Sequence, residues 1–378
     1  MSDNRYEPIP SSILFKNLMD RETIILAANT RIALVMRGIF QAAKDVDAPL
    51  IVELARSESN LEGGYSGLTP AEFSRRAREM AKEVGLDVWS LHADHIGIKK
   101  GTDEDIGSTK ALVSGQIEAG FTSFAIDASH LFNFQGGNLR EELADNIDAT
   151  TKIAKHIQEN IDWDYGLEVE VGEIGREDAH GRVLTRPEEA VTFIKALNEN
   201  GVYPQVIAIA NGSAHGNTYD ASGNLIEQVS IDIEQTRAVA QALKDNGLDV
   251  RIAQHGITGT PRDMIHNHFP HGNIMKGNVA TFYQNIVWDI FKVYEPELYQ
   301  DIWNWTVGTY REKAPEKSDN EIFGKFSKFA VGQFFERIYS VNDDTQKAID
   351  AMVYVETLLF LKAFKAEGTA RIVRDAMK

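Results

Sequence analysis

The segment VWSLHADH, residues 88 to 95, begins as an apolar run and ends with two histidines and an aspartate within four residues. A continuous apolar run of this length is typical of a strand that is buried on both faces of a parallel sheet. His92, Asp94 and His95 are groups that bind metal ions or transfer protons. The segment therefore predicts a buried strand whose carboxyl end carries chemistry.

Seven more runs of this kind follow or precede it, and helical patterns separate them. The expected strands are 24–29, 50–54, 88–92, 121–127, 167–171, 206–211, 250–254 and 273–279. The expected helices include 31–43, 70–84, 108–119, 139–157, 187–198 and 231–246. Eight strand–helix units predict an α/β fold, a (β/α)8 TIM barrel. A doubly wound open sheet is the competing architecture.

The pattern changes after residue 282. Residues 282–293, 318–338 and 344–367 have the pattern of long amphipathic helices rich in aromatic residues, and 301–318 has that of a polar, tryptophan-containing connection. We expect residues 1–285 to form the barrel and residues 286–378 to form a helical extension, packed on the barrel or at a subunit interface. A separate helical domain is the alternative.

The composition excludes several classes of protein and site. The chain has 378 residues, no cysteine and a formal net charge of −17. Disulfides, thiolate metal sites and cysteine nucleophiles are thereby excluded, and no basic stripe for nucleic acid is present. The first residues, MSDNRYEPIPSS, do not resemble a signal peptide, and no apolar run approaches the ~18 residues of a membrane span. We expect a cytoplasmic protein.

Polar residues stand at the carboxyl end of one expected strand after another. In a barrel these ends converge on one face, where active sites lie. Taken singly, a histidine there is usually structural and a carboxylate usually caps a helix. Recurrence on five successive strands instead indicates one pocket. Beyond the first segment, the candidates are Asp127, Glu168, Glu170, His215, His255, Lys276 and Asn278.

Three of the histidines suggest a metal site. His95, His215 and His255 follow three different strands, and three imidazoles with one open position are typical of a catalytic Zn²⁺ or another divalent first-row metal. Asp94 is adjacent to His95, so it can lie near the metal and transfer a proton without being a ligand. Two glycine-rich segments suggest a phosphate site: HGITGTP (255–261, including Gly259) and KGNVAT (276–281, beginning with Lys276). A pair of tight turns would also explain these glycines.

The motifs HADH, IDAS, LEVEVG with GREDAHG, IANGSAHG, QHGITGT and KGNVAT occur in this order between residues 12 and 281. In this order they resemble the class II, metal-dependent fructose-bisphosphate aldolases. The resemblance implies a zinc-dependent barrel, dimeric or larger, that cleaves fructose 1,6-bisphosphate to dihydroxyacetone phosphate and glyceraldehyde 3-phosphate in glycolysis and gluconeogenesis.

The resemblance also implies roles for individual residues. Asp94 moves the proton of the C4 hydroxyl, and Asp178, paired with Glu177, moves the C3 proton, although a glutamate is usual at that second position. The implied zinc ligands are His95, His215 and His255, with Asp127 and Glu170 near an alternative or second cation position. The resemblance leaves room for a monovalent cation as well. The implied contacts of the dihydroxyacetone phosphate end are Gly216, Gly256, Thr258, Asn278 and Thr281.

The chemistry of the reaction supports the same assignment. Cleavage of a C–C bond next to a ketone leaves an enediolate, whose charge a divalent metal stabilises. A carboxylate must take the C4 hydroxyl proton, and an acid must return a proton to C3. Lys99, Lys100 and Lys276 near strand ends leave a Schiff-base mechanism formally open.

The chain departs from the family pattern at the ends of the substrate. Ala280 replaces an acidic residue, and Tyr219 stands where a lysine is usual. An arginine that a neighbouring subunit usually supplies has no clear counterpart; Lys325 or Lys328 could replace it.

Three other functions remain open. A metal-dependent sugar epimerase or isomerase needs the same enediolate stabilisation. A non-catalytic barrel could support a partner enzyme, although it would not need the metal and carboxylate set. A zinc hydrolase is disfavoured, because no H-x-H pair occurs on an early strand.

Overall fold

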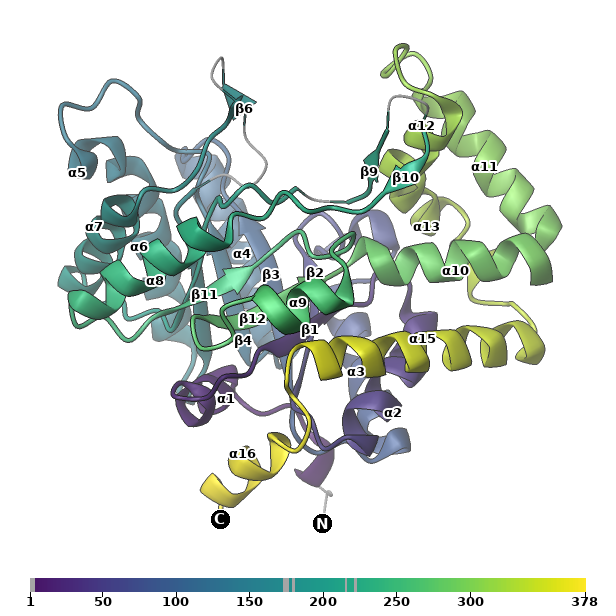
Figure 1. The fold of residues 1–378 in the computed structure, drawn as a ribbon, viewed down its shortest axis with the longest axis horizontal. Helices are drawn as coiled ribbons and strands as arrows, with labels where there is room; N and C mark the ends of the chain where they lie inside the picture. Colours follow the sequence, from purple (N-terminus) through teal and green to yellow (C-terminus); the bar gives the residue numbers. More distant parts are fainter. Residues whose placement is uncertain (1–3, 173–176, 179–180, 215, 221–222) are drawn as a thin grey trace.

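The computed structural model describes residues 4–172, 177–178, 181–214, 216–220 and 223–378. Eight parallel strands form a closed barrel in the order β1-β12-β11-β8-β5-β4-β3-β2 (Figure 1). These strands are β1 (Ile25–Asn29), β2 (Leu50–Ala55), β3 (Trp89–Gly97), β4 (Ser123–Asp127), β5 (Gly166–Glu170), β8 (Val206–Ala208), β11 (Arg251–Gln254) and β12 (Ile274–Val279). The closed sheet confirms the predicted barrel and excludes the open alternative.

Helices surround the barrel. They include α2 (Met36–Asp45), α3 (Pro70–Val84), α4 (Asp103–Glu118), α5 (Leu139–Glu142), α6 (Ala144–Asn160), α7 (Pro187–Glu199), α8 (Ile233–Asp245) and α9 (Arg262–His268). Local sequence explains their ends. Thr69 caps α3 by accepting a hydrogen bond from the Glu72 backbone N–H, with Pro70 as the first helical residue. None of the described helices has both the length and the apolar content that a membrane crossing requires.

The two ends of the barrel interior differ in polarity. At the amino-terminal end, α1 (Ser11–Leu18) packs Leu14, Phe15 and Leu18 against inward-facing apolar residues such as Ile25 and Met275. The hydroxyl of Ser11 on the same helix forms a hydrogen bond with that of Ser123, while the acidic inward-facing residues lie toward the opposite end. That end is where the strands finish and where a site can open to solvent.

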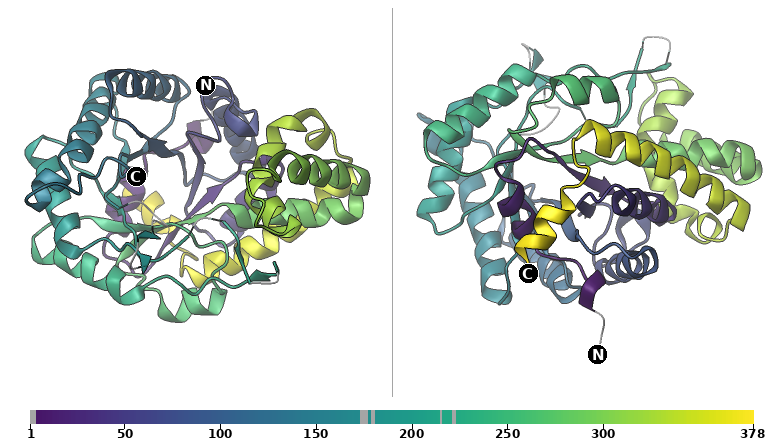
Figure 2. Two further views of the ribbon diagram at one scale, coloured as in Figure 1. Left: turned by 90° about the horizontal axis from the view of Figure 1, so that it is seen from above. Right: turned by 60° about the horizontal axis from the view of Figure 1, so that its bottom comes forward.

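The helices from α10 to α15 gather on one side of the barrel, whereas α16 (Ala370–Ala376) lies apart from them against α1 (Figure 2). The group on the side consists of α10 (Thr281–Tyr294), α11 (Pro296–Tyr310), α12 (Asp319–Phe326), η4 (Ser327–Phe329), α13 (Ala330–Gln333), α14 (Phe335–Ile338) and α15 (Asp343–Ala363). The long helix α15 packs tightly on α2: a Cβ on Gly38 would lie 2.7 Å from the carbonyl oxygen of Asp350. The C-terminal helices are therefore joined firmly to the barrel.

Two expectations for this region were wrong. Residues 301–318 were expected as a polar connection, but most of them belong to helix α11. The buried face of this helix consists of Leu298, Ile302 and Thr306, and so few apolar residues give no clear helical period in the sequence. The single helix expected over 318–338 is instead divided into α12, η4, α13 and α14. At the division, the Ser327 hydroxyl turns inward and accepts hydrogen bonds from the side chains of Gln284 and Trp288.

Replacing Arg251 by methionine is expected to destabilise the fold by at least about 3 kcal/mol, because several buried carbonyl groups would lose their donor. The guanidinium group donates to the carbonyl oxygens of Leu18 (2.9 Å), Met19 (3.0 Å), Arg21 (3.1 Å) and Thr23 (3.1 Å), and also to those of His271 and Ile274. Urea unfolding measures the effect. The exposed Arg237 on α8 is the control, and its methionine variant should lie within about 0.5 kcal/mol of the parent. Equal destabilisation by both variants would contradict the assigned role.

Candidate active site

A cavity of about 1140 Å³ opens at the carboxyl ends of the barrel strands. Its walls come from the ends of β1 to β5 and β12, from the loops after β8 and β11, and from α12 and η4 of the same chain. Of the residues expected in the site, the lining includes Asp94, His95, Asp127, Glu170, Gly216, His255, Gly256, Thr258, Asn278 and Thr281. The fold thus brings together side chains from strands that are far apart in the sequence.

A bulge in β3 explains how two consecutive residues reach this cavity. Ala93 pairs with Phe124 and Ile96 with Ile126, so β3 has one more residue than β4 between these pairs. His95 has a φ of 36°, in the left-handed region that residues other than glycine rarely adopt. Regular alternation would send one of the two side chains outward. The bulge instead lets Asp94 and His95 both line the cavity.

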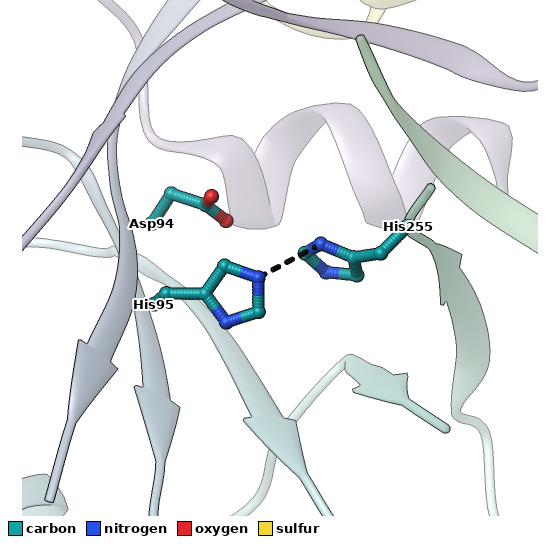
Figure 3. Close-up of side chains that lie close together, drawn as sticks. All are labelled: Asp94, His95 and His255. Carbon is teal, nitrogen blue, oxygen red and sulfur yellow. Dashed lines mark hydrogen bonds between the residues drawn. The ribbon is translucent and has the colours of Figure 1, made fainter. Parts of the chain in front are cut away.

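The imidazoles of His95 and His255 face each other across the site (Figure 3). His95 Nε2 lies 3.1 Å from His255 Nδ1. The outer nitrogen of each ring faces a carboxylate: His95 Nδ1 is 3.1 Å from Glu170, and His255 Nε2 is 3.1 Å from Glu168. Asp127 lies 3.5 Å from the same nitrogen of His95. Both rings are therefore oriented by buried acids, as metal-binding histidines commonly are.

This donor set fits a divalent metal ion. Two nitrogens bound to one tetrahedral Zn²⁺ at roughly 2.0–2.1 Å lie about 3.3 Å apart, close to the observed separation. A carboxylate oxygen of Asp94 and one nitrogen from each of these rings lie within 4.8 Å of one another. His215, the third expected ligand, lies outside the described residues. His95 and His255 would hold the ion, and Glu170 and Glu168 would orient them.

The carboxylates around His95 also control its charge. Burial opposes protonation, but Asp94 and Glu170 raise the pKa of His95 well above its ordinary value. Burial and the neighbouring Asp127 raise the pKa of Glu170 to about 7. An environment that favours an extra positive charge on the imidazole also favours a bound cation, since the surrounding acids stabilise either one.

Lys276 lies in a buried network beneath the cavity. Its Nζ is 2.6 Å from Glu168, 3.2 Å from Glu53 and 3.5 Å from Asp94, and it donates to Nε2 of His92 at 2.9 Å. The side chain is fully buried. Burial disfavours its charge, but the three carboxylates raise the pKa of Lys276 above its ordinary value. Lys276, expected from the sequence at a phosphate site, does not line the cavity and instead faces these buried carboxylates.

The network keeps Asp94 ionised. Burial alone would raise the pKa of Asp94, but the charges of His95 and Lys276 outweigh burial and lower it. Asn278 Nδ2 donates to Asp94 Oδ1 at 3.2 Å and fixes the carboxylate. Burial and the nearby Asp94 raise the pKa of Glu53 to about 8. Asp94 is thus an anchored carboxylate that faces the cavity and can accept a proton.

The remaining expected residues fall into two groups. Gly259 is not among the residues that line the cavity, and its carbonyl accepts a hydrogen bond from the Gln228 backbone N–H at 2.8 Å. The backbone of Glu177 and Asp178 forms strand β6 (Glu177–Asp178), paired with β7 (Gly181–Arg182), whereas their side chains lie outside the described part of the structure.

One wall of the cavity was predicted only in part from the sequence. It contains Arg31, Glu58 and Tyr65, together with Lys325 and Lys328. The sequence suggested the two lysines as contacts supplied by a neighbouring subunit, but the structure places them in the cavity of their own chain. Arg31 follows the end of β1 by two residues, and this position just past a strand end was the sequence signal that could have placed Arg31 in the site.

Known proteins resemble this chain in sequence and fold. The family model described as "Fructose-bisphosphate aldolase class-II" matches residues 11–329. A fructose-bisphosphate aldolase of Corynebacterium glutamicum is 28% identical over 54% of this chain and 58% of that protein. A plasmid-encoded one of Cupriavidus necator is 25% identical over 61% of each. The matches thus span about three fifths of these relatives.

Solved structures with the same fold include the YdjI aldolase from Escherichia coli K12, with a TM-score of 0.60 and 16% identity over 96% of this chain and 99% of that one. The fructose-bisphosphate aldolase from Campylobacter jejuni gives a TM-score of 0.59 and 17% identity over 96% and 97%. At these identities the likeness establishes the fold.

Proposed function

Because this chain belongs to the class II fructose-bisphosphate aldolase family, a family of lyases, we propose that it catalyses the reversible aldol cleavage of fructose 1,6-bisphosphate or a close ketose phosphate. The products are dihydroxyacetone phosphate and an aldehyde, glyceraldehyde 3-phosphate for the bisphosphate. The observation that supports this most strongly is the placement of the ionised Asp94 beside the imidazoles of His95 and His255 on the cavity wall.

Different residues are proposed to carry out the separate proton transfers of the reaction. Asp94 takes the proton of the C4 hydroxyl while the C3–C4 bond breaks; the C4 oxygen becomes the aldehyde carbonyl, and the bonding electron pair remains on the C2–C3 side as an enediolate. His95, His255 and His215 would hold a divalent metal ion such as Zn²⁺, which would supply positive charge beside the reacting oxygens. Asp178, with Glu177, is the proposed source of the proton that C3 receives.

Other groups orient the substrate. Gly216, Gly256, Thr258 and Thr281 line the side of the proposed dihydroxyacetone phosphate end, where backbone N–H groups can approach a phosphate. Asn278 Oδ1 is buried and has no hydrogen-bond partner among the described residues. A substrate hydroxyl that donates to this oxygen would satisfy it.

The wider proposal concerns organisation and location. We propose that residues 1–285 carry the catalytic groups and that residues 286–378 complete the cavity wall. The protein is proposed to work in the cytoplasm as a homodimer or larger oligomer, with Zn²⁺ or another first-row divalent ion and a monovalent cation near Asp127 and Glu170.

Incubation of the purified protein with fructose 1,6-bisphosphate and Zn²⁺ is expected to release two triose phosphates, because the site combines a proton acceptor with a cation position. Product analysis by NMR separates the alternatives. Formation of an epimer or isomer without trioses would assign the protein to the other enediolate reactions. Absence of any reaction across a panel of ketose phosphates would refute the aldolase proposal.

A further inference from the structure

His92 is a buried histidine of β3 to which the proposed reaction assigns no part. It pairs in register with Ser123 on the neighbouring strand β4, and solvent does not reach its side chain. Nδ1 lies 2.7 Å from Ser123 Oγ, and Nε2 lies 2.9 Å from Nζ of Lys276. Both ring nitrogens therefore have a partner inside the barrel.

These two partners fix the tautomer of the ring. An ammonium group can only donate, so Nε2 of His92 must accept the hydrogen bond from Lys276. Burial and the charge of Lys276 lower the pKa of His92, in agreement with a neutral ring. The remaining ring proton is therefore on Nδ1, which donates it to Ser123 Oγ.

The serine that holds Nδ1 is itself fixed by packing. Ser123 Oγ forms a hydrogen bond with the hydroxyl of Ser11 on α1. A Cβ on Gly166 of β5 would lie 2.8 Å from Ser123 Oγ, so a larger residue there would displace the hydroxyl. The orientation of the His92 ring is thus set by its neighbours rather than by chance.

Lys276 has more acceptors around it than protons to donate. Its ammonium group has three N–H groups. Three acceptors lie closest to Nζ: Glu168 at 2.6 Å, His92 at 2.9 Å and Glu53 at 3.2 Å. The fourth, Asp94 Oδ1, is 3.5 Å away. Asp94 therefore lies where it is influenced by the charge of Lys276 without a short hydrogen bond from it.

The cluster around Lys276 is an ion-pair network rather than a second metal site. Glu53, His92 and Asp94 lie close enough together to hold a metal ion. Nζ of Lys276, however, is within 3.5 Å of each of them, so a positive charge is already present among these groups. A second cation would be repelled by this ammonium group.

We propose that His92 is a positioning residue that accepts one proton of Lys276 and so keeps the ammonium group from bonding directly to Asp94. The inference rests on the proposed function, in which Asp94 takes the C4 hydroxyl proton. Lys276 and His92 are both fully buried, so water cannot replace the imidazole as acceptor. Without that acceptor, the ammonium group would turn toward Asp94.

A direct bond from Lys276 would weaken Asp94 as a base. A hydrogen bond to the charged form of a carboxylate stabilises that form and lowers its affinity for a proton. Lys276 approaches Oδ1, the oxygen that already accepts a hydrogen bond from Asn278 at 3.2 Å. The effect would therefore be on the basicity of the carboxylate rather than on access of the substrate to it.

Two substitutions of His92 test the proposal. Leucine has no acceptor, whereas Oε1 of glutamine can take the place of Nε2. His92→Leu is expected to lower kcat for the ketose phosphate that the wild-type protein cleaves by about tenfold, with KM within about twofold. His92→Gln should retain most of the wild-type kcat. An unchanged kcat in His92→Leu, or equal losses in the two variants, would overturn the proposal.

Two further measurements separate this role from a metal-binding or structural one. Metal content per chain and exchange of a hydroxymethyl proton of dihydroxyacetone phosphate in D₂O, followed by NMR, depend on the metal site and on Asp178 rather than on Asp94. Both should stay within about twofold of the wild-type values in His92→Leu. A parallel loss of metal or of exchange would overturn the proposal.

Ser90→Ala is the matched control. Ser90 is a buried residue of the same strand, and its Oγ lies 3.1 Å from Thr122 Oγ1, away from Lys276. This variant should leave kcat and proton exchange unchanged. A loss of kcat equal to that of His92→Leu would show that any change in this buried strand is sufficient, and would overturn the assigned role.

A failure of the proposed function has a different signature. The wild-type protein would then cleave no ketose phosphate and exchange no proton. ¹⁵N NMR of the histidine side chains still tests the arrangement, with the His92→Gln spectrum identifying the signals of His92. Nδ1 should carry the proton and Nε2 should accept a hydrogen bond. A proton on Nε2 would overturn the inference.

Discussion

Replacing Asp94 by asparagine is expected to lower kcat by about 10³-fold, within the range that a positioned acid–base group contributes. The substitution keeps the shape of the side chain and removes the charge that the buried network maintains. Lys276 and Asn278, which hold the carboxylate, would remain in place. Steady-state cleavage of the ketose phosphate measures kcat.

The metal content of the Asp94→Asn variant shows whether a lower kcat reflects loss of the carboxylate or loss of the metal ion. The asparagine variant should retain its divalent metal, measured by elemental mass spectrometry, because His95 and His255 are unchanged. Glu104→Gln is the matched control, since Glu104 is an exposed acid on the rim of the same cavity. A variant of Asp94 that keeps more than a tenth of the wild-type kcat would rule out its role as the base.

Removal of the metal is expected to abolish turnover, with a loss of at least about 100-fold, because a divalent ion would supply the positive charge that stabilises the enediolate. Prolonged dialysis against a chelator should strip the ion, and Zn²⁺ or another first-row divalent ion should restore activity. The ion that restores the highest kcat at stoichiometric loading identifies the preferred metal.

A histidine variant connects this loss to the site. His255→Ala should reduce the bound metal per chain, whereas His268→Ala, an exposed histidine on α9, should leave it unchanged. Full activity in a chelated protein shown to contain no metal would be incompatible with the proposed chemistry.

The barrel could be predicted from the sequence because buried parallel strands are continuous apolar runs. The eight expected strands agree with the observed ones to within a few residues, except that β3 continues through the polar HADH segment to Gly97 and β8 ends early at Ala208. Apolar content ends at His92, so the sequence alone suggested that the strand ends there. Pairing with β2 and β4 maintains the strand beyond that point.

The buried network around Lys276 and the cavity wall that contains Arg31 and Lys328 are harder to predict from the sequence. Lys276 and its partner Glu53 are 223 residues apart in the chain, and their separation in space depends on closure of the barrel. A lysine at a strand end is usually exposed, so a phosphate contact was the natural expectation for Lys276. Arg31 and Lys328 line the same cavity because the C-terminal helices fold back onto the barrel, and no local sequence pattern encodes that arrangement.

The surplus residue in β3 means that the site depends on chain length as well as on residue type. Deleting one residue there would restore regular alternation and turn either the acid or the imidazole away from the cavity, even with every other ligand intact. Single substitutions in a regular barrel could not recreate the arrangement, because an insertion is needed to place both groups side by side. Attempts to transfer this chemistry to another scaffold would therefore have to copy the irregular backbone first.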